Sequence, residues 1–337
     1  MTMPPNLRDL EPDANLDKHV EYLQTDESYR KSCRSVINRL VRDMHKKVPV
    51  KVKAAIKGGS FGKGTALKDN SDIDLVVFLS DYHSVQEVKD KMKYLLDIFE
   101  EYLGRKSRCK IEGRTQFALK INFKCCRSSH EHKVDLLPAC DVLGVGGKIT
   151  KERKREVYAD MLRSDEDLRR YFSASLVVLQ RNFVVGRPAK LKSLIRLFKS
   201  WRISEFPIQS AKGNEKWPTS YVLELITIKR WEEAGRPRSF DLKRGFYSVL
   251  NALIKYEELQ IVWYKHYSKD SLPSHSLPYV IDPANPFNNI YQQYNKWTEV
   301  ADLAKSTLEW PLFEELSKAS DESDSSSNDL NNWNNPS

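Results

Sequence analysis

The sequence predicts an α+β protein in which a sheet lobe precedes a helical lobe. Segments 51–56, 72–79, 117–123 and 133–141 alternate or concentrate apolar and β-branched residues as strands do. From about residue 156 onward, apolar residues recur at helical spacing instead. After Ser317 the composition turns to Ser, Asp and Asn, which favours disorder. We therefore expect a sheet lobe over 1–158, a helical lobe over 159–318 and a disordered acidic tail over 319–337.

The charge balance favours a polyanionic partner. The 337 residues carry a formal net charge of +9, and 40% of them are hydrophobic, as in a globular protein. Residues 319–337 contain four acidic residues and no Lys or Arg, so the charge of +9 rises to +13 over residues 1–318. Such a surplus suits nucleic acid above all, although a merely soluble basic surface would also account for it.

Cysteine usage and hydropathy indicate the compartment. Five scattered cysteines in a chain of this size do not form a secreted disulfide framework, and the first residues have no apolar run behind them. No segment has the apolar length needed to cross a bilayer. We expect a cytoplasmic or nuclear protein that does not bind membranes.

A long amphipathic helix is predicted over 26–47, near the start of the sheet lobe. Thr25 or Asp26 can cap it, and apolar residues recur along one side at helical spacing. The other side is basic and includes Arg39 and Arg42. A second helix, over 84–103, is expected to cover one face of the sheet.

The segment 57–65 is rich in glycine and suits an anion. Four glycines in seven residues allow close approach of backbone N–H groups to phosphate, while Ser60 and Lys63 add a hydroxyl and a positive charge. The P-loop pattern does not fit, because it requires Gly where Lys57 stands and Ser or Thr where Gly64 stands.

Three aspartates predict a metal site. Asp72 and Asp74 lie two residues apart on a predicted strand, so both side chains point the same way. Two adjacent carboxylates repel each other unless a cation lies between them, and their oxygen atoms suit Mg²⁺, with Mn²⁺ as a substitute. Asp135 lies in an otherwise apolar strand, where a shared metal would supply the partner it needs. Asp141, by contrast, is expected in the loop beyond.

The cluster Cys125, Cys126, His130 and His132 is a weaker metal candidate. Thiols and imidazoles bind zinc, but adjacent residues of a strand point to opposite faces. We expect no structural zinc.

A basic helix is predicted to begin near Pro188. Arg196 and Lys199 fall on one flank of this helix, whereas Lys190 falls on the opposite flank. We assign the first edge to a nucleoside triphosphate, and the second, with Arg181 and Arg187, to a longer polyanion outside.

These motifs resemble those of a known family. The glycine segment followed by Asp72-Ile73-Asp74 resembles the nucleotidyltransferases of the polymerase-β type. Within that superfamily, the chain is similar to the 2′-5′-oligoadenylate synthases through the run 187–201, the segment 218–225 and Asp135-Leu136-Leu137-Pro138-Ala139. It resembles a single-unit, invertebrate-type member.

The resemblance implies a fold, a site and an activity. The fold would be bilobal, with a mixed β-sheet lobe, a mostly helical lobe and the active site in the cleft between them. The catalytic residues, which would hold two Mg²⁺ ions, are Asp72, Asp74 and Asp135. The residues that would bind ATP are Ser60, Lys63, Arg196, Lys199, Ser220 and Tyr221, with Glu224 in support. The residues that would contact double-stranded RNA are Arg39, Arg42, Lys57, Arg181, Arg187 and Lys190.

The expected activity is an RNA-activated, template-free polymerisation of ATP into 2′-5′-linked oligoadenylates, as in a sensor of the innate antiviral response. ATP would be both donor and acceptor, and double-stranded RNA the activator. Two alternatives remain open: a cyclic-dinucleotide synthase of the same superfamily, and a catalytically silent RNA-binding protein on the same scaffold.

Overall fold

The computed structural model describes residues 6–68, 73–124, 131–207, 214–267, 272–322 and 333, and for residues 319–322 it describes the backbone alone. Its sheet lobe contains α2 (Glu27–Lys47), β1 (Val52–Lys57), α3 (Gly59–Lys63), β2 (Ile73–Leu79), α4 (Val85–Gly104), β3 (Cys109–Arg114), β4 (Leu119–Lys124), β5 (Glu131–Ala139), α5 (Lys151–Arg163) and α6 (Glu166–Ser175). α7 (Val177–Val185) leads into the helical lobe. That lobe contains η1 (Leu7–Asp9), α1 (Leu16–Leu23), α8 (Ala189–Glu205), α9 (Ser220–Glu233), α10 (Leu242–Ile254), η2 (Tyr256–Glu258), β6 (Gln260–Ile261), β7 (Tyr279–Asp282), β8 (Asn285–Asn289), η4 (Tyr291–Gln293), α11 (Trp297–Leu308), η5 (Pro311–Phe313) and α12 (Glu314–Glu322).

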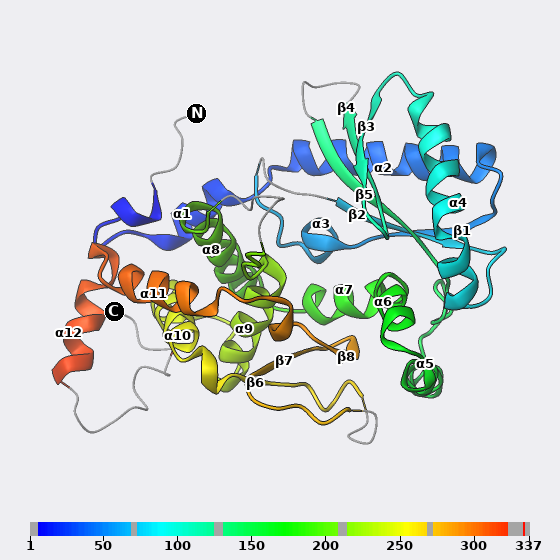
Figure 1. Cartoon of the computed structure of the whole chain (residues 1–337). Helices are drawn as coiled ribbons and strands as arrows, with labels where there is room; N and C mark the ends of the chain where they lie inside the picture. The colour runs from blue at the N-terminus through cyan, green and yellow to red at the C-terminus, as the bar shows by residue number, and fades with distance from the viewer. Residues whose placement is uncertain are drawn as a thin grey trace.

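The mixed sheet has the strand order β1-β2-β5-β4-β3 (Figure 1). β2 and β5 run parallel to each other, and the other neighbouring pairs are antiparallel. In the parallel pair Asp74 is the register partner of Asp135, so the two residues lie side by side on adjacent strands. The sheet therefore brings together two carboxylates that are far apart in the sequence.

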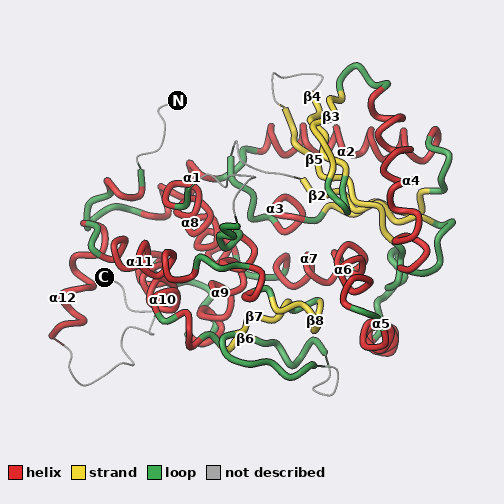
Figure 2. The backbone as a smooth tube through the Cα atoms, viewed as in Figure 1, coloured by secondary structure: helices red, strands yellow, loops and turns green. Residues whose placement is uncertain are grey.

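The two faces of the sheet have different partners. Ile73, Leu75 and Val77 pack with α2 and α4 in one buried cluster, whereas Val76 and Phe78 pack with α7 in another. Asp74 alternates with Val76 and Phe78, so it lies on the face toward α7. The tube in Figure 2 shows α6 and α7 beneath the strands on this side. The aspartate pair thus faces the space between the lobes.

α2 confirms the predicted amphipathic helix almost residue for residue. Asp26 is its N-cap, and the carboxylate accepts a hydrogen bond of 2.6 Å from the backbone N–H of Tyr29. The apolar residues expected on one side of this helix are buried at Tyr29, Cys33, Val36, Ile37, Leu40 and Met44, and half-buried at Val41.

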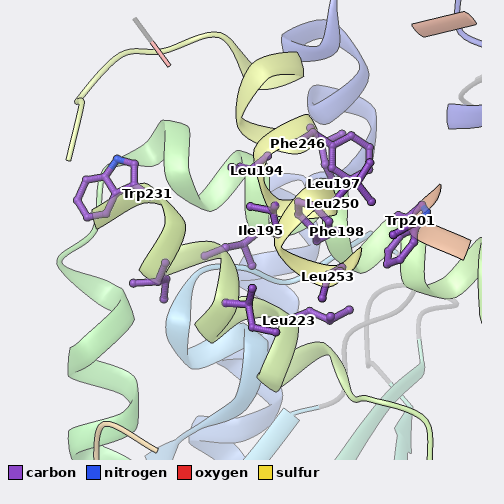
Figure 3. Close-up of a cluster of buried hydrophobic side chains, with 14 of the residues drawn as sticks. Leu194, Ile195, Leu197, Phe198, Trp201, Leu223, Trp231, Phe246, Leu250 and Leu253 are labelled. Atoms are coloured by element: carbon purple, nitrogen blue, oxygen red, sulfur yellow. The ribbon is translucent and has the colours of Figure 1, made fainter. Parts of the chain in front are cut away.

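The core of the helical lobe is centred on α8 and its neighbours α9 and α10. Figure 3 shows its aromatic and aliphatic side chains, among them Phe198, Trp201 and Phe246. The indole N–H of Trp201 donates a 2.8 Å hydrogen bond to Thr307 on α11, which satisfies its polar atom inside the core. None of the helices in the described ranges combines the length and apolar character that a membrane span requires.

The lobes interleave more than the predicted division at residue 158 suggests. The buried side chains of η1 and α1, such as Leu7 and Leu16, belong to the helical core. Those of α5 and α6, such as Met161 and Phe172, belong to the sheet core. We therefore propose that the boundary between the lobes falls in α7, with the N-terminal arm reaching across to the helical lobe.

Four strands of the described structure were not predicted. β3 was not predicted, because it is an edge strand on which exposed and half-buried residues alternate and no large apolar run marks it. The three-stranded sheet β6-β7-β8 was also missed. Within the segment predicted as a tail, α12 runs as far as Glu322, and Trp333 is fully buried against Phe240.

Candidate active site

Asp74 and Asp135 form the acidic centre of the site. Register partners on neighbouring strands lie about 4.8 Å apart, so both carboxylates can reach one cation. Asp72, the third predicted ligand, lies outside the described residues. Within those residues no cluster of three or more His, Cys, Asp or Glu side chains is arranged to hold a metal. The chemistry of the pair fits the group expected here, because two half-buried carboxylates offer hard oxygen ligands to Mg²⁺.

The glycine segment packs directly against Asp74. The backbone N–H of Gly58, its first glycine, donates a 2.7 Å hydrogen bond to the Asp74 carbonyl, and Gly59 has a positive φ of 56°. A Cβ at Gly59 would lie 2.5 Å from the Asp74 carboxylate, so only glycine fits. Residues 59–63 of the segment form the short helix α3, and the amides of Gly62 and Gly64 donate to the carbonyls of Gly58 and Phe61.

A cleft of about 620 Å³ opens beside this centre. It lies between the lobes, with α3 and β2 on one side and α7, α8 and α9 on the other. The predicted site residues that line it are Ser60, Lys63, Asp74, Lys199, Ser220 and Tyr221. Five of the six predicted ATP residues therefore share one cavity with Asp74, one of the predicted catalytic aspartates.

A buried cluster of charges connects α3, α8 and α9 at the inner wall of the cleft. Lys63 Nζ lies 2.7 Å from Glu224 Oε1, and Lys199 Nζ lies 3.8 Å from Glu224 Oε2. Thr65, a residue that we did not predict, joins the cluster by donating to Glu224 and accepting from Lys199. The cluster holds two cations at the cleft with one carboxylate between them.

The pKa values follow from this arrangement. Burial lowers the pKa of Lys199 to about 8, although the Glu224 carboxylate beside it acts in the opposite direction. Burial alone would raise the pKa of Glu224, but Lys63 and Lys199 keep it below its ordinary value. Glu224 is therefore ionised at neutral pH and compensates the cations.

Removing this carboxylate should destabilise the fold. Glu224→Gln removes the carboxylate in direct contact with the buried Lys63 and Lys199, and we expect the free energy of unfolding to fall by about 3 to 5 kcal/mol. Urea denaturation followed by circular dichroism would measure the change. Glu233→Gln is the matched control on the same helix, because the Glu233 side chain is exposed and its ion pairs with Lys229 and Arg230 should contribute less than about 1 kcal/mol. Equal losses in the two variants would contradict the buried role of Glu224.

A second network positions Tyr221. Its ring lies under Lys63 Nζ at 3.9 Å, and its hydroxyl donates a 3.1 Å hydrogen bond to Asp282 Oδ1. Gln180 on α7, which also lines the cleft, donates to the other oxygen of Asp282 at 2.8 Å. Burial raises the pKa of Asp282, an effect that the Ala284 amide, Gln180 and Tyr221 oppose. The sequence alone indicates only a structural turn around Asp282, so its contact with the site was missed.

Arg196 does not line the cleft that Lys199 lines. Its guanidinium donates to the Gly64 and Ala66 carbonyls on the other side of α3, at 2.6 Å and 3.3 Å. There it borders a cavity of about 280 Å³, and the cations that line this basic cavity are Arg30, Arg34, Lys57, Arg181 and Arg196. Burial, together with Arg30, lowers the pKa of Arg196 to about 10. Arg196 is thus placed with the predicted RNA residues Lys57 and Arg181.

The other predicted RNA residues lie elsewhere. Arg187 is mostly buried over Trp231 and pairs with Glu232 at 2.8 Å, so it is committed to the helical lobe. Lys190 pairs with Asp17 of α1 at 2.7 Å. Arg39 and Arg42 are exposed on α2 and do not line the basic cavity.

His132, one member of the zinc candidate, has a structural environment. It is fully buried on β5, where Cys33 Sγ lies 3.2 Å from Nδ1 and Ser32 Oγ lies 3.3 Å from Nε2. Cys125, Cys126 and His130 lie outside the described residues.

Comparisons with known proteins identify the family of this chain. A family described as 2′-5′-oligoadenylate synthetase 1, domain 2, C-terminus, matches residues 151–328, and one described as nucleotidyltransferase domain matches residues 37–135. Rat 2′-5′-oligoadenylate synthase 1A is 33% identical, over 90% of this chain and 91% of the relative. The rat inactive 2′-5′-oligoadenylate synthase 1B is 34% identical, over 90% of this chain and 86% of the relative.

A solved structure from E. coli MS115-1, of a CdnC:HORMA-deltaN complex, shares the fold with a TM-score of 0.56 and 19% identity, covering 87% of each chain. The similarity in fold extends over both lobes. Together with the family matches, it confirms the predicted fold class and the predicted resemblance. The chain belongs to the 2′-5′-oligoadenylate synthase family of polymerase-β-like nucleotidyltransferases.

Proposed function

We propose that this protein is a template-free nucleotidyltransferase that polymerises ATP into 2′-5′-linked oligoadenylates, releases pyrophosphate and is activated by double-stranded RNA. The observation that carries the proposal is the pairing of Asp74 with Asp135 beside a cleft that five predicted ATP residues line. Identity to relatives does not decide activity, since one relative at 34% is named inactive. The acidic pair favours an enzyme, because a silent RNA binder has no use for it.

The residues of the cleft can divide the work as follows. Asp74 and Asp135, with Asp72, would hold two Mg²⁺ ions, which when bound would neutralise charge at the α-phosphate and favour ionisation of the attacking hydroxyl. Ser60, Lys63 and Lys199 hold the triphosphate of the donor.

Asp135 would accept the proton of the acceptor 2′-hydroxyl. The oxygen of this hydroxyl forms the new bond to the α-phosphorus as the bond to pyrophosphate breaks. Tyr221, fixed by Asp282, borders the base.

The basic cavity supports RNA activation. α3 separates it from the cleft: Gly59, Ser60 and Lys63 line the cleft, whereas Phe61, Gly62 and Gly64 line the basic cavity. Five cations crowd around this small space, and a polyanion would relieve their repulsion. A duplex phosphate backbone bound there would act on the same five-residue helix that borders Asp74. Such an RNA sensor would work in the cytoplasm or nucleus.

Product analysis tests the proposal directly. The protein is incubated with ATP, GTP and Mg²⁺, with and without duplex RNA, and the products are identified by mass spectrometry and linkage-specific phosphodiesterase digestion. Linear 2′-5′ oligoadenylates, formed faster with RNA, are the expected result. Cyclic dinucleotides would favour the cyclic-dinucleotide synthase, and the absence of any nucleotidyl product would favour the silent binder.

The pH dependence gives a second test. Lys199 attracts the triphosphate only while its side chain is protonated. The pKa of Lys199 in the free protein is about 8, so kcat/KM for ATP should fall by up to about tenfold per pH unit above that value. Lys199→Arg should move the fall to higher pH, because a guanidinium stays charged. The unfolded chain binds more protons than the folded one between about pH 8 and 10.5, so the same lysine should add stability as pH rises through this window. A profile that falls at the same pH in both proteins would contradict the role of Lys199.

A further inference from the structure

Asp282 is a buried carboxylate behind the wall of the cleft. It lies at the end of β7, is fully buried and, within the described part of the chain, forms no ion pair. Three hydrogen bonds satisfy it instead. Its Oδ1 accepts the Ala284 N–H at 2.8 Å and the Tyr221 hydroxyl at 3.1 Å, and its Oδ2 accepts the Gln180 side-chain amide at 2.8 Å. A buried charge without a cation beside it is costly, which points to a role for the groups that it holds in place.

The contact with Asp282 fixes the orientation of the Gln180 amide. An ionised carboxylate only accepts hydrogen bonds, so the nitrogen of the amide must face Oδ2 and its oxygen must point elsewhere. The Gln180 side chain is half-buried in the wall of the cleft, and its Oε1 accepts no hydrogen bond from the described residues. Turning the amide over would bring two acceptors together inside the protein, at a high cost. Gln180 therefore offers the cleft a fixed acceptor.

This acceptor lies where the base of a donor nucleotide would lie. Gln180 and Tyr221 are bonded to the same carboxylate and both line the cleft, so they lie side by side in its wall. Purine bases differ in the group that they would present there. Adenine carries an amino donor at position 6, whereas guanine carries a carbonyl acceptor. A fixed acceptor pairs with the first group and is left unpaired against the second.

We propose that Asp282 determines donor selectivity by locking Gln180 with its oxygen toward the cleft, so that the site takes a 6-aminopurine triphosphate and rejects a 6-oxopurine triphosphate. The proposal rests on the nucleotidyl transfer proposed above and adds the residues that select ATP over GTP. Gln180 contacts the base, and Asp282 is a positioning residue that acts through Gln180.

Asp282→Asn should reverse the lock. The Ala284 N–H and the Tyr221 hydroxyl both bind Oδ1, so they hold the oxygen of the new amide in place and put its NH₂ group where Oδ2 was. This NH₂ group donates to the Gln180 oxygen, so the Gln180 amide turns over and presents its own NH₂ group to the cleft, where it suits a 6-oxopurine. The variant has nearly the same shape and lacks the buried charge, so we expect it to fold.

Single-addition kinetics measure the selectivity. A 2′-5′ diadenylate is extended with 2′-deoxy-ATP or 2′-deoxy-ITP, which lack a 2′-hydroxyl and so add only once. These donors differ only in the 6-amino or 6-oxo group and the N1 proton that accompanies the latter. In the wild type, kcat/KM should favour 2′-deoxy-ATP at least about tenfold, the scale of one hydrogen bond lost and one acceptor left unpaired. Asp282→Asn should lower this ratio at least about tenfold and raise kcat/KM for 2′-deoxy-ITP, which damage to the fold would not do.

Two further variants separate the Gln180 amide from the rest of the network. Gln180→Met removes the acceptor and keeps a side chain of similar length, so the ratio of the two kcat/KM values should approach one. Tyr221→Phe is the matched control, because it breaks another hydrogen bond to Asp282 but leaves the Gln180 amide oriented. It should keep the wild-type ratio, although both kcat/KM values fall.

Equilibrium binding distinguishes failure of this assignment from failure of the polymerase proposal. The α,β-methylene analogues of ATP and ITP, which cannot react, are titrated with Mg²⁺ into the wild type and the variants by calorimetry. The assignment is overturned if Asp282→Asn and Gln180→Met keep the wild-type selectivity in binding and in transfer. If the wild type forms no nucleotidyl product yet binds the ATP analogue more tightly, and Asp282→Asn inverts this preference, the polymerase proposal fails while the roles of Gln180 and Asp282 stand.

Discussion

Replacing Asp74 by Asn should reduce nucleotidyl transfer by about a hundredfold or more, since it removes a charged group from the centre of the site. The amide has the shape of the carboxylate, so packing against Gly59 is kept. In the free protein Asp74 and Asp135 are like charges on neighbouring strands, and one neutral side chain relieves their repulsion. Thermal stability without metal should therefore be equal to or above that of the wild type.

The effect of Mg²⁺ on the melting temperature distinguishes a metal-binding role of Asp74 from a structural role. Added Mg²⁺ should raise the melting temperature of the wild type and not that of Asp74→Asn, because a ligand stabilises only the form that binds it. Asp81→Asn, beyond the far end of the same strand, is the control and should behave as the wild type. Retention of more than about a tenth of the wild-type rate by Asp74→Asn would contradict the assignment.

The acidic pair shows how far sequence can lead. Alternation within each strand predicts which face a carboxylate occupies, and an aspartate in an apolar strand signals that it needs a partner. Alternation does not say which strands are neighbours. The parallel pairing of β2 with β5 makes Asp74 and Asp135 neighbours. The family resemblance led us to expect these two residues in one site before the register was known.

The basic helix shows where helical periodicity stops being informative. Arg196 and Lys199 lie on one flank, as predicted, yet their long side chains diverge around α3. Lys199 reaches Thr65 at the cleft, whereas Arg196 reaches Gly64 on the opposite side. Helical angle alone does not determine where a flexible side chain ends, because the acceptors come from a distant segment.

Partners distant in sequence explain the remaining differences. The sequence predicts that Arg187 contacts an outer polyanion, but Glu232 of α9 pairs with it and Trp231 covers it. Asp282 appeared to belong to a structural turn, yet its carboxylate holds Tyr221 and Gln180. Neither contact leaves a local pattern, since each depends on helices that meet only in the folded chain.

Reversing two charges of the basic cavity should weaken duplex RNA binding at least tenfold. The double variant Lys57→Glu, Arg181→Glu replaces two of its five cations. Burial, and after it the neighbouring Arg34, already lowers the pKa of Lys57, so removing this cation relieves crowding and should not unfold the protein. Fluorescence anisotropy with a duplex of about 20 base pairs would give the affinity, and the slope of log K against log salt should fall by about 1 for each cation that no longer neutralises a phosphate.

A change of four charge units weakens any polyanion somewhat, so the control must carry the same change. Arg105→Glu combined with Arg163→Glu does this at two exposed arginines outside the cavity. If the cavity is the RNA site, this control keeps most of the affinity and nearly the full salt slope, and RNA still accelerates its synthesis of oligoadenylate. Equal losses of RNA affinity in the two double variants would mean that RNA binding depends only on the overall charge of the protein. The proposal that RNA bound at the basic cavity acts through α3 on Asp74 would then have to be abandoned.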